Sequence, residues 1–341
     1  MEKPTALYEK IFDFDTLLAA HRKTMLGKKD KPEVQKFEAQ REENLISLQN
    51  ELIWHTYTPS LTKIIHITDP KPREINAPAY RDRVLLQAMH IVLSPLFERK
   101  MIYHTYACRK GKGSHAAADM AQRYIREVSL KGKYYVLKCD IKHCYASINQ
   151  DVLKAVIRKT IKEPDVLWLL DVTIDNYGED GVGIPLGAVM SQLFANVYLG
   201  ELDHLIKDGY GFKRYLRYMD DFVLMSNEKE DLKLMLTAIR YWLLSDLKLE
   251  LNAKTRILTG NEGLDFCGYR IWPDNRLPRK RNVRRMRKRL RKMVNLYKKQ
   301  KCTSDAICQS WQSFLGYMKH CKSHDTVVGI YEDLQKQLKG D

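Results

Sequence analysis

The chain has 341 residues, 44% of them hydrophobic, so it can bury a large core and form two or three subdomains. Its 58 Lys and Arg residues exceed its 42 Asp and Glu residues, and the net charge of +16 is typical of proteins that bind polyanions. No apolar run is long enough to span a membrane and no secretory signal opens the sequence, so no membrane role is expected. We therefore expect a cytoplasmic protein whose seven cysteines stay reduced.

The first 65 residues are rich in charge and helical in pattern, and they indicate no function. The segment 73–84 follows and contains Arg73, Arg81 and Arg83. Residues 85–97 are mostly apolar but too few to cross a membrane, which predicts a buried helix.

A strand that ends in an acidic residue is expected next. Residues 134–141 have the pattern of a buried strand that includes Asp140, and Asn149 fits the N-cap of the helix that follows. A buried carboxylate is costly unless it pairs or binds a metal ion. Asp140 is therefore either a capping or ion-paired residue or a metal ligand.

A loop rich in glycine leads into a further helical pattern at residues 183–192. It contains Leu186 and Gly187 and ends at Ser191 and Gln192. Glycines let a backbone approach a flat ligand closely, and Ser191 is expected to cap the helix. An ordinary loop followed by an N-cap explains the same pattern.

The sequence Tyr218-Met219-Asp220-Asp221 lies between two segments that favour strands, which predicts a β-hairpin with the Asp pair at its turn. Such a turn projects carboxylates from a rigid support, as binding of a divalent metal requires. Paired acids at a turn are also commonly solvated. The order of the motifs along the chain is therefore stronger evidence for function than this motif alone.

Two shorter motifs precede a strongly basic segment. Lys254 lies in a turn-like stretch, and residues 263–271 form a predicted hairpin that includes Gly268. Residues 276–301 then contain fourteen Lys and Arg and no Asp or Glu. Their apolar residues share one helical face, which predicts an amphipathic helix: Val283, Met286, Leu290, Met293, Val294 and Tyr297.

The outer face of that basic helix is either a solvated charged face or a surface that follows phosphates. The lack of any compensating acid favours phosphate binding. The residues expected to contact nucleic acid are Arg284, Arg285, Arg287 and Lys288.

The motif order, a strand with Asp140, a glycine loop and a hairpin with Asp220 and Asp221, resembles the palm of a reverse transcriptase. The resemblance covers roughly residues 65–325, and the hairpin with Gly268 resembles the one that grips the primer. It implies an α+β right-hand polymerase fold. The expected parts are an N-terminal helical segment at 1–65, fingers at 66–130, a palm with part of the fingers at 131–272, and a basic helical thumb at 273–341.

The resemblance implies an RNA-directed DNA polymerase that takes dNTPs, a template RNA and two Mg²⁺ ions, and holds an RNA/cDNA duplex. Asp140 and Asp220 would bridge the ions, Asp221 would add charge, and the backbone carbonyl of Ile141 would be a further ligand. Lys254 would act as a general acid toward pyrophosphate, unless it is an ordinary surface lysine.

Further substrate contacts follow from the same resemblance. Tyr145 corresponds to the aromatic residue that excludes a ribose 2′-hydroxyl, although core packing is the alternative. One or two of the fingers arginines would clamp the triphosphate, and Arg83 also fits a structural role. The remaining residues expected at the substrate are Leu186, Gly187 and Gln192.

A narrower resemblance points to the reverse transcriptases of diversity-generating retroelements. It rests on residues 106–115, the loop with Leu186-Gly187 and Ser191-Gln192, and residues 310–317, where Gly316-Tyr317 departs from an expected Gly-His. It implies a bacterial or phage-encoded enzyme that copies a dedicated template RNA with errors at adenines. A small basic accessory protein, in one copy or as an oligomer, is the expected partner.

Other functions remain open at this point. The chain could be another bacterial reverse transcriptase, such as a retron, intron-derived or phage-defence enzyme. It could also be a non-catalytic RNA-binding protein on a polymerase fold, or an RNA-dependent RNA polymerase, which Tyr145 disfavours. The cysteines and histidines after residue 301 match no compact zinc pattern. Little more than a thumb follows the palm, so no further domain is expected.

Overall fold

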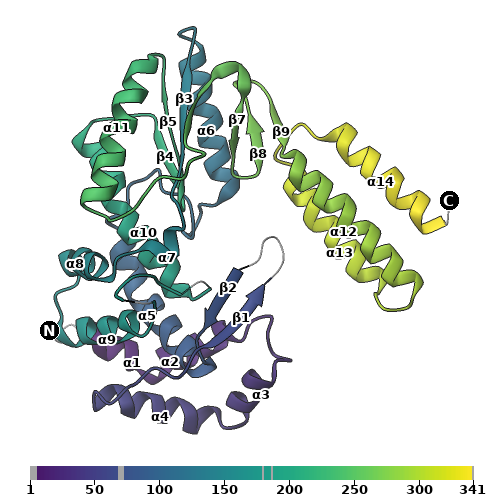
Figure 1. Ribbon diagram of the computed structural model, residues 1–341. Helices are drawn as coiled ribbons and strands as arrows, with labels where there is room; N and C mark the ends of the chain where they lie inside the picture. The colour runs from purple at the N-terminus through teal and green to yellow at the C-terminus, as the bar shows by residue number, and fades with distance from the viewer. Residues whose placement is uncertain (1–5, 68–72, 179, 186, 340–341) are drawn as a thin grey trace, which may run out of the picture. The chain divides into compact units, whose positions relative to one another are not determined.

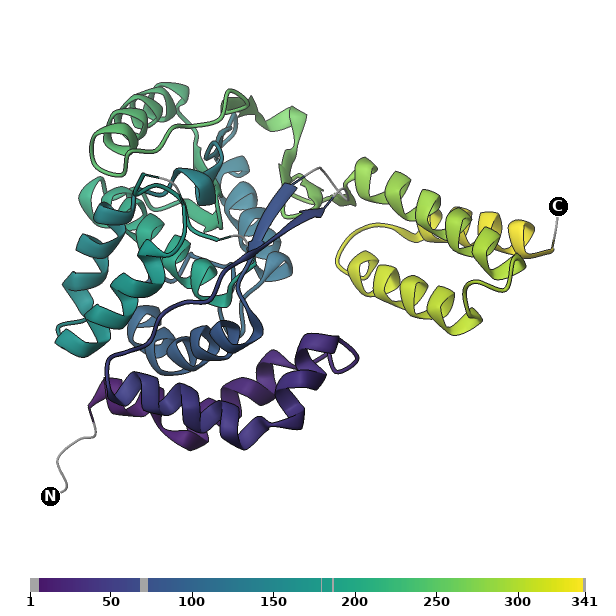
Figure 2. The ribbon, with the colours of Figure 1, turned by 60° about the horizontal axis from the view of Figure 1, so that its bottom comes forward.

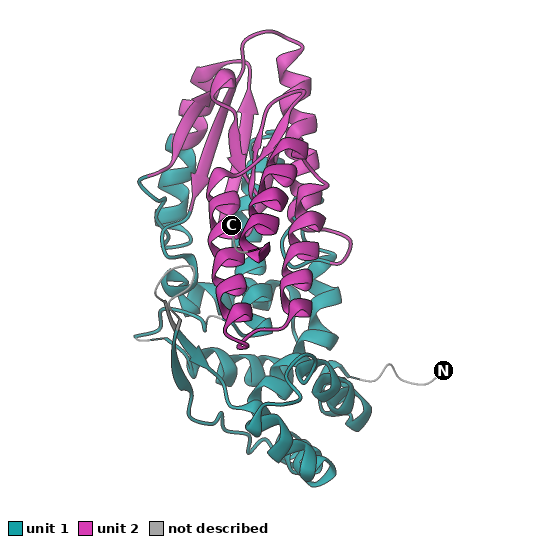
Figure 3. Ribbon diagram, turned by 90° about the vertical axis from the view of Figure 1, so that its right-hand side faces the viewer, with its two compact units in different colours: residues 1–109, 141–212, 237–253 teal, residues 110–140, 213–236, 254–341 magenta. Residues whose placement is uncertain are grey.

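The computed structural model describes residues 6–67, 73–178, 180–185 and 187–339 (Figure 1). The chain divides into two compact units, each built from several stretches of sequence (Figure 3). Unit 1 contains residues 1–109, 141–212 and 237–253, and unit 2 contains residues 110–140, 213–236 and 254–341. Helices and antiparallel sheets both occur, as expected of an α+β fold. The boundaries of fingers, palm and thumb stay a prediction.

Unit 1 is mostly helical and packs around one long apolar helix, α5 (Tyr80–Glu98). This helix confirms the buried helix predicted at residues 85–97. The N-terminal helices, purple in Figure 2, pack on α5 directly or through each other. They are α1 (Leu7–Phe12), α2 (Phe14–Thr24), α3 (Pro32–Ala39) and α4 (Arg41–Ile53). Strands β1 (Lys63–Ile67) and β2 (Arg73–Ala77) form an antiparallel pair.

The rest of unit 1 holds the predicted glycine loop and its flanking helices. These are α7 (Cys144–Ser147), α8 (Gln150–Thr160), α9 (Pro164–Asp175), α10 (Val189–His204), a π-helix (Leu205–Gly209) and the C-terminal part of α11 (Lys229–Ser245). Asn149 caps α8 as predicted, because its side chain accepts a hydrogen bond of 3.0 Å from the Val152 N–H. The prediction that Ser191 caps α10 is wrong. The helix begins two residues earlier, so Ser191 is buried within its first turn.

Unit 2 contains a four-stranded antiparallel sheet in the order β4-β5-β3-β6. Its strands are β3 (Tyr135–Asp140), β4 (Tyr215–Tyr218), β5 (Asp221–Ser226) and β6 (Arg256–Thr259). The buried strand and the Asp-Asp hairpin predicted from the sequence are therefore confirmed. Helix α6 (Ser114–Ser129) packs on β4 and β5.

A second sheet in unit 2 has the order β7-β8-β9. Strands β7 (Leu264–Phe266) and β8 (Tyr269–Ile271) form the hairpin predicted at residues 263–271, after a short 3₁₀ helix (Gly260–Glu262). Strand β9 (Arg276–Pro278) corrects the sequence interpretation, because the basic run begins as a strand and not as a helix. Arg276 is buried there and forms an ion pair of 2.8 Å with Asp119 of α6.

Three helices complete unit 2: α12 (Lys280–Lys298), α13 (Ser304–Met318) and α14 (His324–Lys339). The apolar face predicted for α12 is confirmed, because Met286, Leu290 and Val294 join a buried cluster with residues of α13 and α14. Tyr297, in the last turn of α12, is 43% exposed and lies outside this cluster. Among the helices that the structure describes, none combines the length and the apolar character that crossing a bilayer requires.

Candidate active site

Strand pairing in unit 2 brings two of the predicted catalytic acids together. In the antiparallel pair of β3 and β5, Asp140 lies directly opposite Asp221. Asp220 lies in the tight turn between β4 and β5, one residue before Asp221. A slip of one residue would turn every side chain of β3 to the other face, so the buried apolar residues of this strand fix the position of Asp140.

A buried arginine stabilises the turn that carries Asp220. Met219 has a φ of 55°, which is an uncommon conformation for a residue with a side chain. Arg217 is fully buried on β4 and its guanidinium donates a hydrogen bond of 3.0 Å to the Met219 carbonyl. This bond supports the strained residue between the two strands, and with it the carboxylate beside it.

The three carboxylates interact electrostatically. Burial raises the pKa of Asp221 to about 6, and the negative charges of Asp140 and Asp220 act in the same direction. Lys138 and Arg279 act against this rise. The net shift of the pKa is upward because burial and the two acids together outweigh these cations. A bound cation would act in the same direction as Lys138 and Arg279.

Magnesium fits this site by its donor chemistry, because carboxylate oxygens are its preferred protein ligands. Asp140, Asp220 and Asp221 are the side chains that would hold it. Within the described ranges, the structure contains no group of three or more His, Cys, Asp or Glu side chains already arranged around a metal position.

Sequence reasoning missed Lys138, although its signal was visible. It is a charged residue in an apolar strand, two positions before Asp140 and so on the same face. Its ammonium group lies 3.9 Å from a carboxylate oxygen of Asp221 and donates a hydrogen bond of 2.7 Å to the Asp265 carbonyl. Lys138 thereby links the acids to strand β7.

The turn of the β7–β8 hairpin, Cys267-Gly268, also belongs to this environment. Burial and the charge of Asp221 both raise the pKa of the Cys267 thiol, which indicates that the turn lies near the acids. Gly268 has a φ of 89°, and a Cβ added there would lie 3.3 Å from the Asn282 amide nitrogen. This position therefore favours glycine for both its backbone and its space.

Tyr317 joins this hairpin turn to the helices of unit 2. Its hydroxyl donates to the Gly268 carbonyl and accepts a hydrogen bond of 3.3 Å from the Arg279 N–H. Its ring stacks on Tyr269, with centroids 4.9 Å apart. The residue that departs from the expected Gly-His pattern thus has a structural role here.

Two segments that carry the retroelement resemblance meet at Tyr269. The Tyr269 hydroxyl donates to the Tyr317 carbonyl over 3.0 Å, so it accepts from His115 Nδ1, 2.8 Å away. His115 also stacks on His320, with centroids 3.7 Å apart. Burial lowers the pKa of His115, and His320 and Arg276 add to this effect.

Other predicted residues lie in unit 1. Tyr145 is half-buried in α7, and its carbonyl accepts a hydrogen bond of 2.9 Å from the Ile184 N–H of the glycine loop. Gly187 has a φ of 94° and Gln192 is half-buried in α10, whereas Leu186 lies outside the described residues. Ile141 forms an isolated bridge with Leu251. The exposed Lys254, a little further along the chain, belongs to unit 2.

The fingers arginines have partners within unit 1. Arg81 forms an ion pair with Glu51 and lies over the Tyr57 ring, 5.2 Å from its centroid. Arg83 pairs with Glu33 over 2.5 Å. Both contacts are structural, so a role at a triphosphate would require them to rearrange. Arg73 begins β2, and its side chain lies outside the described part of the chain.

The basic residues of α12 do not all have the same environment. Arg284, Arg285 and Lys288 are exposed, as expected of an outer face. Arg287 instead forms an ion pair with Asp333 of α14. The helical pattern identified the charged face but could not show which neighbouring helix covers its edge.

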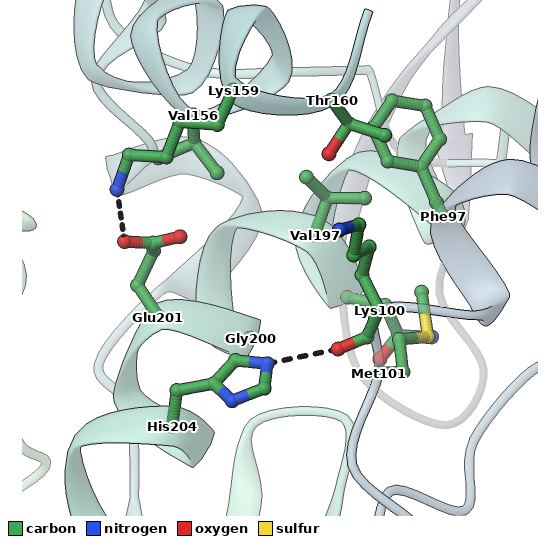
Figure 4. Close-up of a pocket in the computed structure, with 11 residues that line it drawn as sticks. Phe97, Lys100, Met101, Val156, Lys159, Thr160, Val197, Gly200, Glu201 and His204 are labelled. Carbon is green, nitrogen blue, oxygen red and sulfur yellow. Dashed lines mark hydrogen bonds and ion pairs between the residues drawn. The ribbon is translucent and has the colours of Figure 1, made fainter. Parts of the chain in front are cut away.

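Unit 1 also contains a cavity of about 200 Å³ between α5, α8 and α10 (Figure 4). Its lining includes Lys159 and Glu201, which pair over 2.5 Å, and His204. The His204 ring contacts Asp208 over 2.6 Å and the Lys100 carbonyl over 2.8 Å. Burial opposes protonation of His204, but these two acceptors outweigh it and raise the pKa. None of Asp140, Asp220 and Asp221 lines this cavity, so the cavity is separate from the candidate catalytic acids.

Comparison with known proteins identifies the family. The model of the family "Reverse transcriptase (RNA-dependent DNA polymerase)" matches residues 66–271, which include Asp140, Asp220 and Asp221. The chain belongs to the reverse transcriptase family. It is accordingly an RNA-directed DNA polymerase, and the predicted enzyme class is confirmed.

Individual relatives agree with this assignment. YkfC of Escherichia coli is 26% identical over 66% of this chain and 70% of its own length. The group II intron-encoded protein LtrA of Lactococcus lactis is 22% identical over 70% of this chain and 51% of its own length. Apo telomerase from Candida tropicalis is similar in structure, with a TM-score of 0.53 and 14% identity over 81% of this chain and 59% of its own length. This last likeness confirms the polymerase fold.

Tyr317→Phe tests the link between the hairpin turn and the helices of unit 2. Loss of the hydroxyl removes its bonds to the Gly268 carbonyl and the Arg279 N–H, which still bond to each other over 2.9 Å, so the free energy of unfolding should fall by about 0.5–1.5 kcal/mol. Chemical denaturation measures the change. Tyr297→Phe, at an exposed tyrosine of the same unit, is the matched control and should have little effect. Equal stability of both variants would show that the hydroxyl contributes no link.

Proposed function

We propose that this reverse transcriptase makes cDNA from a dedicated template RNA by two-metal nucleotidyl transfer, with frequent errors at adenines, for targeted gene diversification. The observation that supports the catalytic part is the register of β3 and β5, in which Asp140 lies opposite Asp221, the residue that follows Asp220. The proposal that the enzyme diversifies a target gene rests on the sequence patterns at residues 106–115, 186–192 and 310–317.

In the proposed reaction the primer 3′-hydroxyl loses its proton and attacks the α-phosphate of a dNTP. A new P–O bond forms as the bond to pyrophosphate breaks. Magnesium ions, when bound, stabilise the negative charge on the attacking and leaving oxygens. Asp140 and Asp220 would hold both ions, the Ile141 carbonyl would be a further ligand, and Asp221 would add charge.

Further residues are proposed for the substrate site. Lys254 is the proposed proton donor to pyrophosphate. The triphosphate would be clamped by Arg73, Arg81 or Arg83, and the ion pairs of Arg81 and Arg83 make Arg73 the first candidate. Gly187 and Gln192 would line the nucleotide site, and Gly268 and the exposed cations of α12 would contact the duplex.

The partners follow from the same proposal. The net charge of +16 supports binding of the template RNA and the RNA/cDNA duplex. We include a small basic accessory protein, alone or as an oligomer, and a bacterial or phage-encoded origin, on the retroelement resemblance alone. An intron-derived enzyme is the second candidate, because the intron-encoded protein LtrA matches 70% of this chain. A near-repeat in the flanking DNA that differs at adenines would distinguish them.

Asp220→Asn should lower dNTP incorporation by roughly 100-fold or more, because loss of even one contact to developing charge costs this much. The substitution preserves volume, so the circular dichroism spectrum should not change. Primer extension with Mg²⁺ provides the measurement, and Asp274→Asn, at a side chain that is 92% exposed, is the control. Near-normal extension by Asp220→Asn would overturn the catalytic assignment.

Tyr145→Ala should admit ribonucleotides, since the proposal is that the ring occupies the space of a 2′-hydroxyl. The measurement is the ratio of the efficiencies with which dNTPs and rNTPs are incorporated on one primer-template. A shift of the ratio toward rNTPs is expected. An unchanged ratio with extension intact would make Tyr145 a packing residue.

Leu186→Gln should reduce misincorporation opposite adenine more than opposite the other bases. A Gln side chain can hydrogen-bond near the nascent base pair, whereas Leu offers only apolar contact. One such interaction changes discrimination by roughly tenfold. Sequencing of cDNA copied from a template with all four bases measures the error spectrum. The same spectrum in both enzymes would place the source of infidelity elsewhere.

A further inference from the structure

An open groove of about 410 Å³ runs between α12 and α13 in unit 2. Its floor is apolar and includes the buried side chains of Met286 and Phe314. Its polar residues come from matching turns of the two helices. Asn282, Arg285 and Arg289 line it from α12, and Ser310, Ser313 and Tyr317 line it from α13. Their spacing of three and four residues keeps the α12 side chains on one side of the helix.

The buried hydroxyl of Ser310 is a second feature of this groove. The residue is only 7% exposed, and its hydroxyl has no hydrogen-bond partner in the described structure. A helical serine commonly bonds to the carbonyl one turn earlier, but Ser310 does not. A buried hydroxyl without a partner costs free energy, so its presence in a groove indicates a ligand that accepts a hydrogen bond.

The charge of the groove indicates that this ligand is an anion. No acidic residue lines it. Among the described side chains, Arg285 and Arg289 form no ion pair, whereas the neighbouring Arg279 and Arg287 pair with Asp265 and Asp333. No acid among the described residues neutralises either groove arginine, so both are available to bind an anion.

The position of the groove connects it with the catalytic acids. The Asn282 amide donates to the Tyr317 hydroxyl over 3.4 Å, and that hydroxyl donates to the Gly268 carbonyl. The preceding residue, Cys267, lies close enough to Asp221 to feel its charge. Two residues that line the groove, Asn282 and Tyr317, are therefore linked by hydrogen bonds to the hairpin turn near Asp221.

We infer that this groove is a binding site for backbone phosphate of the nucleic-acid strand that ends at Asp140, Asp220 and Asp221. The Ser310 hydroxyl donates to a phosphate oxygen, and Arg285 and Arg289 supply charge. Both arginines are exposed, so their side chains can move to admit the phosphate to the groove floor. This inference rests on the proposed polymerase function. It narrows the proposed contact with nucleic acid from the whole cationic face of α12 to one groove.

The test measures the affinity of an RNA–DNA primer-template duplex at several salt concentrations, in an Asp220→Asn background that prevents turnover. Ser310→Ala should weaken binding by about 3- to 10-fold, as expected for one hydrogen bond. The slope of log affinity against log salt should not change, because a neutral donor releases no counterion. The melting temperature should stay the same or rise, since a buried unsatisfied group is removed.

Arg285→Gln should weaken binding and reduce the salt slope by about one unit. Arg284→Gln is the matched control, because Arg284 is the adjacent exposed arginine and does not line the groove. It should weaken binding less than Arg285→Gln does. Ser304→Ala, at an exposed serine of α13, controls for the loss of a hydroxyl.

Unchanged affinity of Ser310→Ala would overturn the inference, as would equal losses for Arg284→Gln and Arg285→Gln. A fall in melting temperature of Ser310→Ala with normal affinity would likewise overturn it, since the hydroxyl would then be structural. Failure of the polymerase proposal is distinguishable, because the enzyme without any substitution would then show no primer extension.

Discussion

The register of β3 against β5 is the constraint on which the active site depends. It sets Asp140 opposite Asp221, with Asp220 in the adjoining turn, so three acids share one end of a sheet. Burial and mutual repulsion raise the pKa of Asp221, which means that this arrangement is electrostatically unfavourable without a cation. The buried apolar residues of both strands hold it in place, because any other register would expose them. The fold thus stabilises a charge cluster that suits a divalent metal.

A second set of contacts joins this cluster to the rest of unit 2. Lys138 connects Asp221 to the Asp265 carbonyl, and Asp265 in turn pairs with Arg279 at the start of α12. Tyr317 ties the hairpin turn to the same helix. The start of the cationic helix α12 is therefore linked to Asp221 through Asp265 of β7 and Lys138. A change in the hairpin should affect both binding and catalysis.

Local patterns in the sequence predicted the elements but not the contacts between them. The strand with Asp140, the Asp-Asp hairpin, the Asn149 cap and the apolar face of α12 follow from periodicity and capping rules, and all four are confirmed. The bond from Lys138 to Asp265 joins residues 127 positions apart, and no local pattern contains it. The same holds for the partner of Arg287 and for the unpaired hydroxyl of Ser310. Ser191 shows that sequence patterns do not fix the first residue of a helix, because several residues near the start of α10 fit a cap.

Thermal unfolding with and without Mg²⁺ tests the central claim most directly, because it detects metal binding independently of polymerisation. A ligand that binds only the folded state stabilises it by an amount set by its concentration and affinity, about 2.7 kcal/mol at 100 times the Kd. The melting temperature should rise with Mg²⁺, relative to NaCl at matched ionic strength. In Asp140→Asn most of this rise should disappear. A rise of the same size in Asp140→Asn would contradict the claim that the acids on β3 and β5 form the metal site.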